Sequence, residues 1–102
     1  MTTVLEQTLL SAIYRLCDKS DVKYHHCSDS RKCAGPGLPD LVLCGTRRVI
    51  WRELKSSPVD SPTSGQVVWM YYLRAAGQDI KIWTPADLKS GSIETEISEL
   101  TW

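Results

Sequence analysis

Two acidic residues and a lysine near the middle of the sequence have a spacing that suits phosphate chemistry. Asp40 follows a proline, and Glu53 and Lys55 stand two positions apart further along the chain. Side chains alternate along a β-strand, so Glu53 and Lys55 would project from one face, about 7 Å apart along the backbone. Two carboxylates and one ammonium group brought together in this way could bind a divalent cation and a phosphate.

Such a group suits the hydrolysis of a phosphodiester bond. Mg²⁺ takes oxygen ligands, and its sites commonly hold one or two carboxylates completed by water and substrate phosphate. Asp40 and Glu53 are the candidate metal-binding carboxylates, and the backbone carbonyl of Leu54 is a candidate third ligand. The metal would polarise the phosphate and lower the pKa of a bound water. Lys55 would orient that water or neutralise the negative charge that grows in the transition state.

The same residues also fit a simple ion pair. Asp40 could pair with Lys55 across two strands, with Glu53 uninvolved. Surface pairs of this kind are common and contribute only about 0–1 kcal/mol to stability. On these three residues alone the ion pair is the simpler interpretation, so the surrounding sequence has to decide.

The segments around the three residues predict a β-hairpin. Residues 38–44 form one predicted strand, Gly45-Thr46 a tight turn, and residues 48–55 a second strand. A turn at this position places Asp40 at the open end of the hairpin, beside Glu53 and Lys55. The hairpin therefore gathers the candidate catalytic groups at one place.

Helices and two more strands complete the predicted order. Apolar residues at helical spacing predict a helix over residues 3–17. The other predicted elements are a strand at 22–26, a helix at 65–76, a strand at 80–83, a short helix opened by Thr84-Pro85, and a helical tail with Ile93, Ile97 and Leu100. This order predicts a mixed sheet with helices against it, and the tail would pack on the body or on a second subunit.

The length and composition fit one globular domain over residues 1–102. The sequence has no run of about 18 apolar residues and no secretory signal, so we expect no membrane span and a location in the cytoplasm. Cytoplasmic thiols stay reduced, so we expect no disulfide among Cys17, Cys27, Cys33 and Cys44. Cys17 and Cys44 lie in apolar patterns and are predicted to be small buried hydrophobic residues.

The charge distribution allows a nucleic-acid partner although the formal net charge is zero. Residues 15–55 contain nine of the twelve Lys and Arg residues but only five of the twelve Asp and Glu residues. A neutral protein that is polarised in this way can present one basic face to phosphates. A solvated surface of mixed charge is the alternative interpretation.

Beyond the triplet, the sequence resembles the VRR-NUC family of the PD-(D/E)xK nuclease superfamily. The resemblance covers about residues 3–88 and rests on elements that occur in family order: Ser30-Arg31, Gly37-Leu38-Pro39-Asp40-Leu41, Glu53-Leu54-Lys55, Gln66, Leu73, Ala76-Gly77, Trp83, Pro85 and Asp87. It implies a restriction-endonuclease-like α/β fold, a mixed β-sheet flanked by helices. Arg52 stands on a face where an apolar residue would pack better, and the acidic tail at 89–102 has no clear family counterpart.

The resemblance also implies a function. The chain most resembles stand-alone phage members, which are similar to Holliday-junction resolvases and act as homodimers on branched DNA. An endonuclease that depends on Mg²⁺ or Mn²⁺ is therefore expected, in the cytoplasm of a phage-infected host. By the same resemblance Asp40 and Glu53 match the metal-binding acids, Lys55 the catalytic lysine, and Gln66 a glutamine of the active site.

Gln66 and Glu6 each have a second interpretation. Gln66 shares the inward face of its predicted helix with Met70 and Leu73, where an active-site hydrogen bond or an ordinary core partner would satisfy its amide. Glu6 matches a first-helix glutamate that assists the metal in the superfamily. The pair Thr3 and Glu6 is also a capping box, which needs no catalysis.

A polar stretch before the Gly-x-Pro-Asp motif is the predicted DNA contact. His25 and Ser30-Arg31 resemble the corresponding stretch in phage members, and Lys32 adjoins it. The planar guanidinium of Arg31 suits a phosphate. A solvated arginine in a loop is the alternative.

Three other functions fit parts of the sequence. His25, His26, Cys27 and Cys33 could form a zinc module, although their spacing matches structural zinc sites poorly. Cys27 and His25 could form a cysteine–histidine hydrolase, but no third residue stands out to orient the base. A catalytically inactive DNA-binding module of the same fold is the third, and it gains nothing from clustered acids near phosphates.

Overall fold

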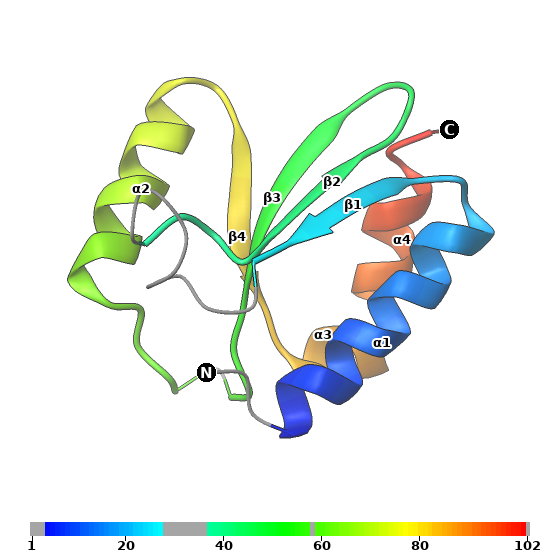
Figure 1. Cartoon of the computed structure of the whole chain (residues 1–102), viewed down its shortest axis with the longest axis horizontal. Coiled ribbons are helices and arrows are strands. Elements are labelled where there is room, and N and C mark those ends of the chain that lie inside the picture. The colour runs from blue at the N-terminus through cyan, green and yellow to red at the C-terminus, as the bar shows by residue number, and fades with distance from the viewer. Residues whose placement is uncertain (1–3, 28–36, 58, 102) are drawn as a thin grey trace.

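Four strands form one mixed sheet at the centre of the fold (Figure 1). The computed structural model describes residues 4–27, 37–57 and 59–101. The strands lie side by side in chain order: β1 (Lys23–His26), β2 (Leu41–Cys44), β3 (Val49–Leu54) and β4 (Asp79–Trp83). The pairs β1–β2 and β2–β3 are antiparallel and β3–β4 is parallel. The predicted mixed sheet and its central hairpin are thus confirmed.

Helices cover both faces of this sheet unequally. They are α1 (Val4–Lys19), α2 (Ser64–Ala75), α3 (Pro85–Ser90) and α4 (Ser92–Ser98). Figure 1 shows α1, α3 and α4 together on one side of the sheet and α2 on the other, next to β4. In the described part of the chain, no helix is long and apolar enough to cross a membrane.

The main core lies between the sheet and the side that carries α1, α3 and α4. On α1, the buried residues Leu9, Ile13 and Cys17 recur at every fourth position, so one stripe of the helix faces the sheet. The C-terminal residues Ile93, Ile97 and Leu100 join the same core and are fully buried. Of the two placements expected for the tail, the structure shows the one on the body.

The end of the described chain also holds the hairpin turn in place. The backbone N–H of Arg47 donates to the carbonyl of Leu100 at 2.9 Å. A Cβ atom at Gly45 would lie only 2.3 Å from the same carbonyl oxygen. A glycine is therefore required in this turn because the backbone after α4 packs directly on it.

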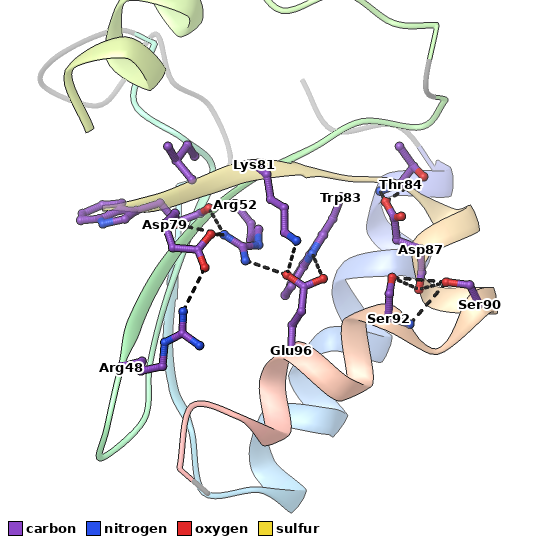
Figure 2. Close-up of polar contacts among 12 residues, drawn as sticks. Arg48, Arg52, Asp79, Lys81, Trp83, Thr84, Asp87, Ser90, Ser92 and Glu96 are labelled. Carbon is purple, nitrogen blue, oxygen red and sulfur yellow. Dashed lines mark hydrogen bonds and ion pairs between the residues drawn. The ribbon is translucent and has the colours of Figure 1, made fainter. Parts of the chain in front are cut away.

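Arg52 is buried, and both terminal nitrogens of its guanidinium pair with acids on other elements (Figure 2). Its side chain is 1% exposed, its Nη1 donates to Asp79 Oδ1 at 3.0 Å, and its Nη2 donates to Glu96 Oε1 at 2.7 Å. The guanidinium carbon also lies 5.1 Å from the centre of the Trp83 ring, and Lys81 joins Glu96 at 2.9 Å. Arg52 does stand on the core-facing side of β3, as expected, and Asp79 and the tail residue Glu96 compensate its charge there.

We predict that Arg52→Ala lowers the free energy of unfolding by about 3 kcal/mol, because it empties a buried position and separates a buried ion pair. Arg47→Ala is the matched control, since Arg47 lies exposed in the turn of the same hairpin. Urea unfolding of the wild type and both variants measures the difference. An equal loss in the two variants would contradict a structural role for the buried pair.

Candidate active site

The hairpin brings the two predicted acids into direct contact. Leu41 pairs with Arg52 across β2 and β3, so Asp40 and Glu53 lie opposite each other at the open end. The backbone N–H of Asp40 donates to Glu53 Oε1 at 3.2 Å, and the N–H of Leu54 donates to Asp40 Oδ2 at 3.0 Å. Each carboxylate is therefore held by the backbone of the neighbouring strand.

Lys55 and Gln66 complete a hydrogen-bonded group around Glu53. Lys55 Nζ lies 3.5 Å from Glu53 Oε2 and donates to Gln66 Oε1 at 3.2 Å. Gln66 Nε2 donates to the same Glu53 Oε2 at 2.8 Å. Among the ion pairs of the described residues, Lys55 pairs with Glu53 and not with Asp40, so the simple cross-strand pair considered from the sequence is not formed.

Alternation along β3 decides which residues reach this group. Leu54 joins the core on the side of α1 and α4, and Arg52 reaches Glu96 on the same side. Glu53 and Lys55 therefore point to the opposite side, where Gln66 begins α2. Glu53 is nevertheless only 3% exposed, because the Asp40 segment and the first turn of α2 close over it.

Gly37 shows why a glycine precedes the Leu-Pro-Asp sequence. Its φ of +95° lies in the left-handed region. A Cβ atom there would lie 2.5 Å from the backbone carbon of Gly65 and 2.9 Å from the backbone nitrogen of Gln66. The chain that leads to Asp40 thus packs against the first turn of α2 without an intervening side chain. This contact sets the distance between the acid-bearing strand and Gln66.

Burial makes the two carboxyl groups hard to ionise together. Burial, followed by the charge of Asp40, raises the pKa of Glu53 to about 8. Burial also raises the pKa of Asp40, although the N–H of Leu54 opposes this by donating to its carboxylate. Near neutral pH, protonated Glu53 donates a hydrogen bond to Asp40. The pair therefore shares one proton where two negative charges would repel each other.

The donor set fits a hard divalent cation. A cation would take the place of the shared proton and neutralise both carboxylates, and Mg²⁺ needs only one or two carboxylates besides water and phosphate. Within residues 4–27, 37–57 and 59–101, no group of three or more His, Cys, Asp or Glu side chains is arranged to hold a metal. Asp40 and Glu53, with the adjacent Leu54 backbone, offer the oxygen donors that such a cation would need.

Glu6 lies on the first turn of α1 and faces the same region. Its charge acts on Asp40 and helps to raise the pKa of that carboxyl group. The charge of Glu6 also acts on His26. Side chains of α1 and β1 therefore approach the site from the core side of the sheet. Thr3, the expected capping partner of Glu6, lies outside the described residues.

Of the four residues predicted to contact DNA, only His25 lies in the described part of the chain. His25 is exposed on β1, whereas Ser30, Arg31 and Lys32 lie outside the described residues. His26 is the histidine near Asp40: burial lowers its pKa, and the charge of Asp40 opposes that shift. From the sequence, His26 was considered only as a zinc ligand and was not placed near Asp40. The apolar Val22, four positions earlier, is the signal that His26 lies on the core-facing side of β1.

The cysteines correct two expectations. Cys27 is disulfide-bonded, so the prediction that all four thiols are reduced is wrong at this position. Its sulfur is consequently neither a zinc ligand nor a catalytic thiolate, which removes the basis of the zinc module and of the cysteine–histidine hydrolase. Cys17 is free and buried as predicted, but the free Cys44 is exposed.

We predict that the metal-free protein becomes less stable as the pH rises from about 4.5 to about 8. Folded Glu53 keeps its proton across this window while the unfolded chain, with its ordinary carboxyl pKa, has lost it. Thermal unfolding in EDTA at several pH values measures the slope. Glu53→Gln should make this slope less negative and Glu94→Gln, at an exposed acid of α4, should not. Because the lowered pKa of His26 acts in the opposite direction, the comparison between variants is decisive, and equal slopes for the wild type and Glu53→Gln would contradict the raised pKa of Glu53.

The fold is shared with a protein of known structure. No protein-family model matches the sequence, and no curated protein matches it. A solved structure of a "VRR_NUC domain protein" superposes with a TM-score of 0.70, covering 99% of this chain and 93% of that chain at 16% sequence identity. The fold implied by the sequence resemblance is thereby confirmed: the chain has a restriction-endonuclease-like α/β fold, a mixed sheet flanked by helices, in common with a VRR_NUC domain protein.

Proposed function

We propose that this protein is a metal-dependent endonuclease that hydrolyses phosphodiester bonds in DNA. The observation that carries the proposal is the contact between the half-buried Asp40 and the buried Glu53, with Lys55 and Gln66 hydrogen-bonded around them. A buried acid pair is costly unless something compensates it, and a divalent cation does so. The fold shared with a VRR_NUC domain protein agrees with this chemistry.

Each residue has a defined part in the proposed reaction. Asp40 and Glu53 would hold Mg²⁺ or Mn²⁺, with Leu54 and Glu6 assisting, and the cation would supply a polarised phosphate and an acidic water. Lys55 would hold the attacking water or neutralise charge on the phosphate in the transition state. Gln66 keeps Lys55 close to Glu53, which would pre-organise the site before DNA binds.

We further propose that the enzyme acts as a homodimer on branched DNA. The outer face of α2 carries four exposed apolar side chains, Val67, Val68, Tyr71 and Tyr72, which are 51–68% exposed. Arg74 is the one charged residue of this helix. A helix that is apolar on all sides is normally buried, and a second copy would cover this face. Two-fold symmetry would then present two sites to the two strands of a junction.

We expect the wild type to cleave a labelled four-way junction with Mg²⁺ or Mn²⁺ and not with EDTA. Lys55→Ala should lower the cleavage rate about 100-fold or more, because it removes charge stabilisation in the transition state. Lys81→Ala is the matched control: Lys81 lies on β4, on the opposite face, paired with Glu96. Gel assays on the junction and on a linear duplex of matching sequence measure both rates.

Each outcome of this assay decides one part of the proposal. Preference for the junction over the duplex supports action on branched DNA, and equal rates contradict it. If the wild type binds DNA but cleaves nothing with either metal, the nuclease proposal fails and a DNA-binding module of the same fold remains. Equal loss of activity in Lys55→Ala and Lys81→Ala would deny Lys55 a catalytic role.

We expect the wild type to sediment as a dimer and the double variant Val68→Ser, Tyr72→Ser to sediment as a monomer. The two side chains are exposed, so their replacement removes apolar contact area without emptying the core. Val59→Ser is the control, since Val59 is 85% exposed outside α2. Analytical ultracentrifugation with and without junction DNA gives the masses. A wild type that stays monomeric with DNA present would exclude paired cleavage by a dimer.

A further inference from the structure

We propose that Thr63, the residue before α2, is a positioning residue of the active site. This inference rests on the proposed nuclease function. Thr63 has no hydrogen bond to Lys55 or Glu53 among those of the described residues, and it acts on both through Gln66. Its peptide N–H selects the orientation of the Gln66 side-chain amide, and that orientation decides where the ammonium group of Lys55 is held.

The amide of Gln66 has two ends with opposite hydrogen-bonding character. Its Oε1 can only accept and its Nε2 can only donate. Oε1 accepts from the backbone N–H of Thr63 at 2.9 Å and from Lys55 Nζ at 3.2 Å, and Nε2 donates to Glu53 Oε2 at 2.8 Å. A flipped amide would direct its N–H₂ at two donors and its oxygen at a carboxylate. The N–H of Thr63 and the Glu53 carboxyl oxygen therefore favour the same orientation, in which Oε1 is available to Lys55.

The backbone of Thr63 is itself held firmly. Thr63 is the N-cap of α2, with φ −69° and ψ 165°, and its Oγ1 accepts from the N–H of Gln66 at 3.2 Å. Its carbonyl accepts from the N–H of Val67 at 3.0 Å. Gly65, in the first turn of α2, packs closely against Gly37 in the chain that leads to Asp40. The capping box therefore begins α2 and also holds the side-chain amide of Gln66 in place.

The Thr63 N–H would affect catalysis through the position of the Lys55 ammonium group. Lys55 has a long, flexible side chain, and only a fixed acceptor restricts its ammonium group to one position. Gln66 Oε1 is such an acceptor because the Thr63 N–H anchors it. Without that anchor the amide is held only by Glu53 and Lys55, so the ammonium group of Lys55 is placed less precisely relative to the phosphate. A misplacement of about 1 Å can lower an enzymatic rate by about two orders of magnitude.

The test removes the N–H of Thr63 and leaves the catalytic residues unchanged. Thr63→Pro does so at a backbone φ that proline accepts, and it also removes the capping hydroxyl. Thr63→Ala is the matched control because it loses the same hydroxyl but keeps the N–H. Thr63→Ser keeps both groups and should behave as the wild type. We measure kcat and KM for cleavage of the four-way junction with Mg²⁺, at a temperature well below the unfolding of each variant.

We expect Thr63→Pro to lower kcat about 10-fold or more with KM changed less than about twofold. Thr63→Ala should stay within about threefold of the wild-type kcat, since the loss of a cap affects mainly stability. Equal kcat values for Thr63→Pro and Thr63→Ala would overturn the inference and leave the nuclease proposal intact. A wild type that does not cleave would overturn both.

A second substitution covers the case in which Thr63→Pro does not fold. An ester in place of the peptide bond between Pro62 and Thr63 removes the N–H and retains the threonine side chain with its cap. Its circular dichroism spectrum should match that of the wild type. A lowered kcat in this ester variant supports the positioning role, and a wild-type kcat overturns it.

Discussion

The side-chain alternation of β3 is the constraint on which the other features depend. Successive side chains point to opposite faces of the sheet. Arg52 and Leu54 lie on the core side, and Glu53 and Lys55, the residue after β3, lie on the side of α2. The strand is central in the hairpin and pairs with both β2 and β4, so its backbone is held from two sides. One short segment therefore supplies the structural anchor of the sheet and the charged groups of the site.

The two faces of the sheet differ in their packing and in their polar contacts. On the core side, α1 and α4 bury a continuous apolar cluster, and Glu96 brings a carboxylate to the buried guanidinium of Arg52. On the other side α2 contacts the sheet mainly along β4, and its first turn reaches Glu53 through Gln66. Close packing behind the strand thus supports the group formed by Asp40, Glu53, Lys55 and Gln66 on the other face. Such support from a well-packed scaffold is what precise placement of reactive groups requires.

Much of the fold could be predicted from the sequence because its signals are local. The hairpin follows from a turn between two apolar strands, and alternation alone places Glu53 and Lys55 on one face. The partners of Arg52 were not predicted, because Asp79 and Glu96 stand 27 and 44 positions away and no local pattern indicates them. The disulfide of Cys27 was also not predicted, because the sequence was expected to fold where thiols stay reduced. Long-range compensation of charge becomes visible only when the elements are placed in space.

The alternation along β3 also bears on how faithfully the chain folds. A slip of this strand by one position would exchange its two faces, placing the carboxylate of Glu53 among apolar side chains and Leu54 next to the helix start at Gln66. The register seen here is therefore favoured twice, by hydrophobic burial and by the avoidance of a buried, unpaired acid. A misregistered sheet would be less stable and would not bring Glu53 to Gln66, so one six-residue strand determines both the packing and the assembly of the site.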